Sequence, residues 1–334
     1  MRAWVLARQA PIDEHPLELV ELPTPQPQAD EVLVRVAMCG ICRTDLHIAE
    51  GDLAAAKDRL ILGHEIVGRV DAVGDRVTRV RVGEKVGVTW LGRTCGECKH
   101  CRAGRENYCA DFQATGRDLD GGFAEHAVAH EDAVFSLEGI ELPDEEIAPM
   151  LCAGVAGYCA FRLMNVEAGD RVGLYGFGPT AYYVLEAAAH LGIDVYVSSR
   201  SPRNLERARR HGAVWAGNAA ERPPPVELGA AIVFPPAGAL VELALRHVEP
   251  GGVVVLAPVA MSTIEIDDYS AHLWGRDIRT LYNVNRRDAE EFLRLAREID
   301  LGLGTEVFPF DACQEAMIRV RNGDIHEANA AVRI

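Results

Sequence analysis

The chain has 334 residues, of which 49% are hydrophobic and 25% charged, a composition typical of globular proteins and long enough for two domains. Its formal net charge of −16 argues against nucleic acid as a partner, and no uninterrupted apolar run approaches the about 18 residues that a transmembrane helix needs. The N-terminus has no apolar stretch of signal-peptide length, so the nine cysteines point to a reducing, cytoplasmic location.

Short Val-rich runs punctuated by Gly and Asp fill roughly the first 150 residues and predict β-strands. Several short strands at near-regular spacing favour a small barrel or sandwich. The strands are expected at 31–40, 65–74, 79–90 and 123–137.

From about residue 153 the pattern changes to continuous apolar strands that alternate with helices, which predicts a doubly wound parallel sheet. Strands are expected at 171–176, 195–199, 230–234 and 253–258, and helices at 180–192 and 204–213. The Pro-rich run 221–227 is expected to be a loop. Beyond about residue 286 the pattern predicts a helix at 288–299, a strand at 305–310 and a further helix.

Four cysteines have the spacing C-x2-C-x2-C-x7-C: Cys95, Cys98, Cys101 and Cys109. Four thiolates gathered in one short loop suit a closed tetrahedral zinc site. Two local disulfides are the weaker alternative, because cysteines so close in sequence would close small, strained loops. A zinc site of this kind stabilises the fold and does no chemistry, so the function has to lie elsewhere.

A glycine-rich turn joins the predicted strand 171–176 to the next helix. Gly176 permits a tight turn, Gly178 lets a pyrophosphate approach the backbone, and Ala181 allows close packing. Pro179 suits the first helical position, followed by Thr180, and the helix N-terminus offers free N–H groups to phosphates. The turn therefore predicts a dinucleotide site, with a plain strand–helix turn as the alternative.

The end of the next strand discriminates between two cofactors. NAD sites usually place Asp or Glu there, whereas this chain has Ser199 and Arg200, with Arg203 one turn later. A hydroxyl and guanidinium groups would bind a 2′-phosphate that a carboxylate would repel. NADP(H) is therefore favoured over NAD(H), for which Arg200 would be a solvated loop residue.

At this point the chain resembles the zinc-dependent medium-chain alcohol dehydrogenases over nearly its whole length. The resemblance is carried by CGICRTDLH (39–47), GHEIVGRVDAVGDRV (63–77), the four-cysteine loop, LCAG (151–154) and the glycine turn. It implies an α/β fold with three parts: a GroES-like catalytic domain, a Rossmann cofactor domain and a C-terminal segment that completes the first domain. Their expected bounds are 1–152, 153–285 and 286–334.

The resemblance also implies a second, catalytic zinc. Its ligands would be Cys42, His64 and Cys152, with Glu65 near the metal and able to coordinate it transiently. Three protein ligands and one open position are typical of catalytic zinc, and two thiolates with a neutral imidazole balance the charge of Zn²⁺. Asp45 is expected to orient a ligand such as His64. Each of these residues taken singly is as compatible with a structural role.

The implied reaction is reversible hydride transfer between an alcohol and NAD(P)⁺, with zinc as Lewis acid on the substrate oxygen. Thr44 and His47 match the inner and outer members of the family's proton relay. Arg43 matches a position that touches the cofactor pyrophosphate in some relatives. Trp90 and Leu91 match pocket positions, and their bulk favours an apolar primary or secondary alcohol.

Two other functions remain open from the sequence. A zinc-free quinone or enoyl reductase could use the same scaffold, although Cys42, His64 and Cys152 argue against it. A four-cysteine zinc ribbon that binds nucleic acid or protein is the non-enzymatic alternative, and its nucleic-acid version conflicts with the net charge. The expected partners are a small alcohol or aldehyde and other copies of the chain, a tetramer rather than a dimer, with no membrane.

Overall fold

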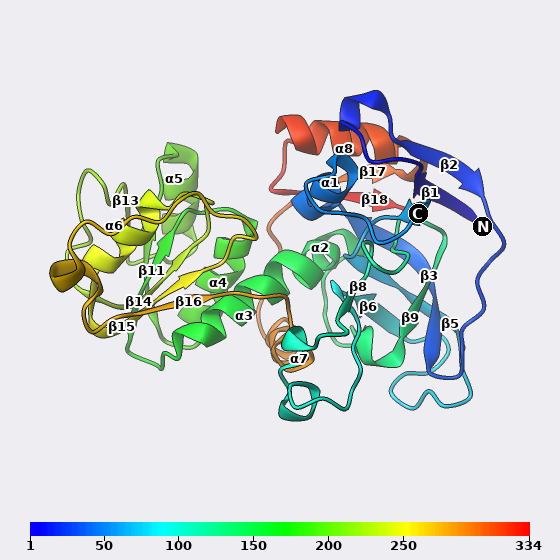
Figure 1. Cartoon of the computed structure of the whole chain (residues 1–334), viewed down its shortest axis with the longest axis horizontal. Helices are drawn as coiled ribbons and strands as arrows, with labels where there is room; N and C mark the ends of the chain where they lie inside the picture. The colour runs from blue at the N-terminus through cyan, green and yellow to red at the C-terminus, as the bar shows by residue number, and fades with distance from the viewer. The chain divides into compact units, whose positions relative to one another are not determined.

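Two separately packed units make up the chain, and the computed structural model describes all of residues 1–334 (Figure 1). The first unit combines Met1–Cys152 with Asn283–Ile334, and the second is Ala153–Tyr282. The chain thus returns to the first unit at Asn283, rather than at the expected residue 286.

A seven-stranded sheet forms the framework of the first unit, in the order β10-β6-β5-β3-β18-β17 with β9 also paired to β3. On β3, Val34 and Val36 point into the core while Arg35 between them is exposed, because successive side chains of a strand face opposite ways. The strands are β3 (Glu31–Gly40), β5 (Ile66–Val73), β6 (Lys85–Val88), β9 (His126–His130), β10 (Val134–Ser136), β17 (Thr305–Pro309) and β18 (Asn329–Arg333).

Two of the strands expected in this region differ in length from the prediction. The run 79–90 contains only the short strand β6, because the chain turns before it and Gly83 takes a φ of +87°. The run 123–137 is divided into β9 and β10 by a 3₁₀ turn at Glu131–Ala133. The strands expected at 31–40 and 65–74 are β3 and β5.

The C-terminal segment completes the core of the first unit. Strand β18 pairs antiparallel with β3, with Val332 opposite Cys39, and Met317 of α8 packs in the same core cluster as Val34. The remaining elements of this unit are β1 (Arg2–Leu6), β2 (Leu17–Glu21), β4 (Leu60–Ile61), β7 (Leu91–Arg93), β8 (Gln113–Ala114), α1 (Arg43–Glu50), α2 (Asp144–Pro149), α7 (Arg286–Leu295) and α8 (Cys313–Asn322). Short 3₁₀ helices lie at η1 (Ile12–Glu14), η2 (Cys101–Ala103), η3 (Glu106–Tyr108), η4 (Glu131–Ala133) and η7 (Phe310–Ala312).

The second unit is built on six strands that all run parallel, in the order β13-β12-β11-β14-β15-β16. The order of the strands reverses between β11 and β14, which is the switch point where doubly wound sheets bind dinucleotides. The predicted doubly wound parallel sheet is confirmed. Its elements are β11 (Arg171–Tyr175), β12 (Asp194–Ser198), β13 (Trp215–Gly217), β14 (Leu228–Val233), β15 (Val248–Leu256), β16 (Asp277–Thr280), α3 (Val155–Met164), α4 (Pro179–His190), α5 (Pro202–Arg210), α6 (Ala239–His247) and the π-helix η6 (Tyr269–Leu273).

A helical run that the sequence pattern did not predict extends from Asp144 to Met164, through α2, a π-helical turn η5 (Met150–Gly154) and α3. Pro149 lacks an N–H and crowds the preceding turn, which accounts for the irregular ladder there. By length and composition the run could cross a membrane, but 72% of its most apolar window is buried inside the protein. That burial is typical of a core helix. The π-helical turn carries Cys152.

Candidate metal centres and cofactor loop

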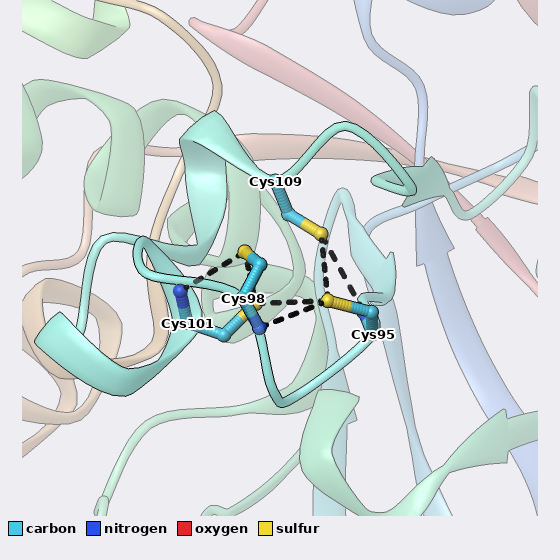
Figure 2. A group of neighbouring side chains, drawn as sticks. All are labelled: Cys95, Cys98, Cys101 and Cys109. Atoms are coloured by element: carbon cyan, nitrogen blue, oxygen red, sulfur yellow. Dashed lines mark hydrogen bonds between the residues drawn. The ribbon is translucent and has the colours of Figure 1, made fainter.

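The four predicted loop cysteines converge between strands β7 and β8, and Figure 2 shows their sulfurs pointing toward one another. The Sγ–Sγ distances are 3.5 Å for Cys95–Cys109, 3.6 Å for Cys98–Cys101 and 3.8 Å for Cys95–Cys101. A disulfide would bring two sulfurs to about 2.05 Å. Sulfurs bound to one zinc ion at about 2.3 Å lie about 3.8 Å apart, so the observed spacing fits a tetrahedral metal site.

Backbone N–H groups already favour thiolates in this loop. The N–H of Cys98 points to the sulfur of Cys95 at 3.4 Å, and the N–H of Cys101 points to the sulfur of Cys98 at 3.5 Å. The latter contact lowers the pKa of Cys98 to about 7, whereas burial raises the pKa of Cys101 to about 12. Backbone N–H donors stabilise the negatively charged thiolate, which is the form of cysteine that binds a metal.

A second cluster brings together residues that are far apart in the sequence. One donor atom each from Cys42, His64, Glu65 and Cys152 lie within 4.8 Å of one another, and the Cys42 and Cys152 sulfurs are 3.7 Å apart. This sulfur spacing is again that of two ligands on one zinc ion. The structure therefore places all four predicted residues of the catalytic site in one group.

Helix α1 positions Cys42 through its N-terminal cap. The sulfur of Cys42 accepts the N–H of Thr44 at 3.5 Å, and the carboxylate of Asp45 accepts the N–H of Cys42 at 2.8 Å. This reciprocal arrangement is a capping box with a sulfur in place of the usual hydroxyl. The cap fixes the direction of the Cys42 side chain.

Asp45 also orients His64, as expected. The second oxygen of the buried Asp45 carboxylate lies 3.2 Å from Nδ1 of His64 and accepts the N–H of Gly63 at 3.1 Å. A proton on Nδ1 leaves Nε2 as a lone-pair donor. That Nε2 atom is buried and has no hydrogen-bond partner. Because buried polar groups are normally satisfied, an unpartnered nitrogen facing two sulfurs is the strongest sign of a metal ligand in the molecule.

Glu65 lies beside this group with its side chain 4% exposed. Its carboxylate occupies the space next to Gly40, where a Cβ would collide with the Glu65 side chain. Burial, reinforced by the sulfur of Cys42, raises the pKa of Glu65 well above its usual value. A carboxyl group held here supplies a fourth donor to the cluster.

The acid–base states of the two sulfurs differ. The contact with Cys152, followed by that with His64, holds the pKa of Cys42 well below that of a free thiol. The same contact, together with burial, raises the pKa of Cys152. Burial opposes the charged form of His64, but the Asp45 carboxylate and the Cys42 sulfur together outweigh it and raise the pKa of the imidazole. A metal that binds Nε2 would therefore displace a proton from it.

The two residues matched to a proton relay lie on α1, three positions apart and therefore on one face. Thr44 Oγ1 lies 3.6 Å from the sulfur of Cys42. The side chain of His47 is 42% exposed, and its Nδ1 lies 2.8 Å from the carboxylate of Asp52. The face therefore extends from the cysteine cluster to solvent. Arg43 is exposed and donates to the carbonyl of Arg321 at 3.4 Å.

In the second unit the glycine turn connects β11 to α4 as predicted. Gly176 has a φ of +90°, and a Cβ there would lie 2.6 Å from the ring of Pro235. At Gly178, the N-cap of α4, a Cβ would meet nothing, which leaves the backbone open to a ligand. Pro179 and Thr180 begin α4, and Ala181 is fully buried.

No carboxylate follows the end of strand β12. Ser199 comes directly after it, with its hydroxyl accepting the N–H of Ser201 at 3.2 Å, and Arg200 and Arg203 are exposed. The local charge is therefore positive at the position where NAD sites place an acid.

The chain matches known proteins along its whole length. Residues 28–139 match the family model of the alcohol dehydrogenase GroES-like domain. The chain is 40% identical to the "Probable alcohol dehydrogenase AdhA" of Mycobacterium tuberculosis (strain CDC 1551 / Oshkosh), over 99% of this chain and 96% of that protein. It is 33% identical to an alcohol dehydrogenase of Geobacillus stearothermophilus, over 93% of this chain and 94% of that protein.

The chain belongs to the medium-chain alcohol dehydrogenase family. Among solved structures, the cinnamyl alcohol dehydrogenase SbCAD4 of Sorghum bicolor has a TM-score of 0.85 at 27% identity, covering 99% of this chain and 97% of that chain. The resemblance drawn from the sequence and the GroES-like and Rossmann fold class are thereby confirmed. The protein is an oxidoreductase of the alcohol dehydrogenase type, which acts on small molecules.

One residue of this dehydrogenase that the sequence did not single out connects the two cysteine clusters. Asn283, with a φ of +53°, accepts a hydrogen bond from the indole N–H of Trp90 at 3.1 Å and donates to the carbonyl of Asn107 at 3.5 Å. The Trp90 ring meets His64 edge-on, with the ring centroids 5.1 Å apart. Asn107 belongs to the four-cysteine loop. Asn283 therefore holds the predicted pocket residue Trp90 against the His64 cluster, whereas Leu91 is buried in β7.

Proposed function

We propose that the protein is a zinc-dependent alcohol dehydrogenase that exchanges hydride between an apolar alcohol and NADP(H), with two zinc ions per chain. The observation that carries the proposal is the buried Nε2 of His64, which lacks a partner and faces the sulfurs of Cys42 and Cys152. Leaving such a nitrogen unsatisfied costs about 1–3 kcal/mol, and a bound cation would remove that cost. Two sulfurs and one imidazole are a ligand set that zinc accepts with one position left open.

A zinc ion held at this site would determine the chemistry of the substrate oxygen. Bound to Cys42, His64 and Cys152, zinc would supply a Lewis acid for the substrate oxygen, and the nicotinamide would exchange hydride with the substrate carbon. Asp45 keeps the Nδ1 proton of His64 in place and so keeps Nε2 available as a donor. The Trp90 ring shields the imidazole edge from water.

The proton that accompanies hydride transfer needs a route out of this buried region. The Thr44 hydroxyl, 3.6 Å from the Cys42 sulfur, is placed to accept it, and His47 lies one helical turn further along the same face. The His47 imidazole, paired with Asp52 at 2.8 Å and 42% exposed, can exchange it with solvent.

The preference for NADP(H) rests on Ser199, Arg200 and Arg203, which present a hydroxyl and positive charge at the end of β12. The double substitution Ser199→Asp with Arg200→Ile should shift the ratio of kcat/KM for NADPH over NADH by about 10- to 100-fold toward NADH, because hydrogen bonds to a charged group are worth about 1.5–3 kcal/mol. Arg210→Ile, at the last residue of helix α5, is the matched control and should leave the ratio unchanged. An unchanged ratio in the double variant would remove the phosphate-binding role.

The function itself is tested by measuring kcat/KM for both cofactors across aliphatic and aromatic alcohols and aldehydes, together with the zinc content of the active protein. We expect turnover of apolar alcohols by protein that carries two zinc ions. Turnover of quinones or enones by protein with one zinc ion or none would instead establish the zinc-free reductase.

A further inference from the structure

The outer face of the large sheet in the first unit carries a row of basic side chains across four neighbouring strands. Lys85 on β6 is in register with Arg69 on β5, Arg69 with Arg35 on β3, and Arg35 with His126 on β9. These four residues are called the basic row, and their strands are labelled in Figure 1. Val34 and Val36, which flank Arg35 along β3, belong to the core cluster, so the row faces outward.

Such a row is unfavourable for the sheet alone. Like charges directly opposite each other on neighbouring strands repel, and the chain has a surplus of acids with which they could have been paired. Yet neither Arg35 nor Arg69 makes an ion pair, and the one hydrogen bond of the Arg69 side chain goes to the carbonyl of Gly83 at 3.0 Å. The centre of the row is therefore left with two uncompensated guanidinium groups.

Acidic groups are present, but they engage the ends of the row and other partners. Asp144 lies 2.7 Å from the ammonium of Lys85, and Asp71 lies 3.7 Å from Nε2 of His126. Glu125 is held by the guanidinium and the backbone N–H of Arg2 at 3.1 and 2.8 Å. Ile334 borders the same region, and its backbone N–H donates to the carbonyl of Ala37 at 3.1 Å.

The four basic residues line a hollow of about 480 Å³ in the surface of the first unit. The His126 side chain is 19% exposed, and its Nε2 lies toward Asp71. A concave site that contains the Arg35 guanidinium, and the Arg69 guanidinium with its single contact to a backbone carbonyl, has the donors that bind an oxyanion. Guanidinium groups match carboxylate and phosphate oxygens in pairs.

We propose that this hollow is a binding site for a small oxyanion with two or more negative charges, held between Arg35 and Arg69. The ligand relieves the repulsion within the row, so binding and stability are coupled. Phosphate and dicarboxylate groups share this chemistry, and the experiment separates them. The site uses none of the residues assigned to the metal clusters, and the cofactor residues Ser199 and Arg200 lie in the other unit.

The test is calorimetric titration of the full-length, zinc-loaded protein with inorganic phosphate and, separately, with succinate, at constant ionic strength set by sodium chloride. We expect one site per chain, and a dissociation constant weakened at least about tenfold in the double variant Arg35→Gln with Arg69→Gln, because two charge-assisted contacts are lost. The matched control is Arg8→Gln with Arg59→Gln, which removes two exposed arginines of the same unit and should bind like the native chain. Binding of phosphate alone, of succinate alone or of both defines the ligand group.

Three results would overturn the proposal. The native chain could bind neither anion, or the double variant could bind as tightly as the native chain. Alternatively, binding could survive in the double variant and disappear in Ser199→Asp with Arg200→Ile, which would place the anion at the dinucleotide loop. A second readout needs no ligand: without added anion, Arg35→Gln should raise or preserve the melting temperature, whereas a drop would show that this guanidinium serves the fold and not a ligand.

Discussion

The two cysteine clusters of the first unit are built in opposite ways. The four-cysteine loop takes every sulfur from one short segment and stabilises them with backbone N–H groups. The group of Cys42, His64, Glu65 and Cys152 is assembled from three separate segments and is oriented by a buried carboxylate, that of Asp45. The loop offers four cysteine sulfurs, which would fill all four coordination positions of a tetrahedral zinc ion. The dispersed group offers sulfur, nitrogen and oxygen donors, and its imidazole nitrogen has no hydrogen-bond partner. The difference separates a site suited to stability from one suited to chemistry.

The sharpest way to test this contrast is to remove one sulfur from the dispersed group. Cys152→Ala should reduce kcat/KM by about 10³-fold or more, because it removes a ligand of the proposed Lewis acid, which contributes several kcal/mol to the transition state. The melting temperature should change little, since the core around the π-helical turn is retained. Retained activity in steady-state assays with a verified fold would take Cys152 out of the ligand set.

The matched change in the loop is expected to act on stability instead. Cys98→Ser should lower the melting temperature by on the order of 10 °C, because loss of a structural metal belongs to the mutations that cost about 4 kcal/mol or more. The protein that remains folded at low temperature should keep most of its kcat. Calorimetry or circular dichroism measures the first effect, and a melting temperature equal to that of the native chain would contradict the structural role of the loop.

Asp45 provides an intermediate case, because it acts on the cluster through His64 and Cys42. Asp45→Asn should reduce zinc affinity and kcat/KM by about 10- to 100-fold, the usual effect of removing a carboxylate that orients a ligating histidine. Competition with a zinc chelator measures the zinc affinity, and activity assays at saturating zinc show whether the lost activity returns. Together they distinguish a positioning role of Asp45 from a purely structural one. Activity fully restored by excess zinc fits positioning, and native zinc affinity would exclude it.

The smallest change in activity is expected for substitution of Asn283, which contacts Trp90 and the four-cysteine loop. Asn283→Ala removes the acceptor for the Trp90 indole, a hydrogen bond worth about 1 kcal/mol, and should raise KM for bulky alcohols about fivefold with kcat nearly unchanged. Asn283→Asp keeps an acceptor oxygen for Trp90 and removes only the donor to the Asn107 carbonyl, so its KM should stay close to that of the native enzyme. Equal KM values for all three proteins would show that Asn283 does not position Trp90.

The same contrast explains how much the sequence revealed. The spacing of Cys95, Cys98, Cys101 and Cys109 predicts a metal loop because all the required geometry is local. Cys42, His64 and Cys152 could be grouped only through resemblance to a family, because nothing in the sequence spacing itself brings them together. The alternation of strands and helices after residue 153 predicted the parallel sheet correctly, since buried parallel strands are continuous apolar runs.

Other features were invisible because they depend on tertiary structure. Pro149 and the glycines that follow obscure the helical pattern of 144–164, and burial maintains the helix there. Asn283, three residues before the helix 286–295, gives no sign that it binds Trp90. The basic row exists only because the strand register aligns residues from four separate strands, and register is set by the packed core.

The central claim, that the dispersed cluster holds a catalytic metal through His64 Nε2, can be tested by crystallography at the zinc absorption edge. An anomalous difference map should contain two peaks per chain, one among the loop sulfurs and one in contact with Cys42, His64 and Cys152. A single peak at the loop in fully active protein would contradict the account.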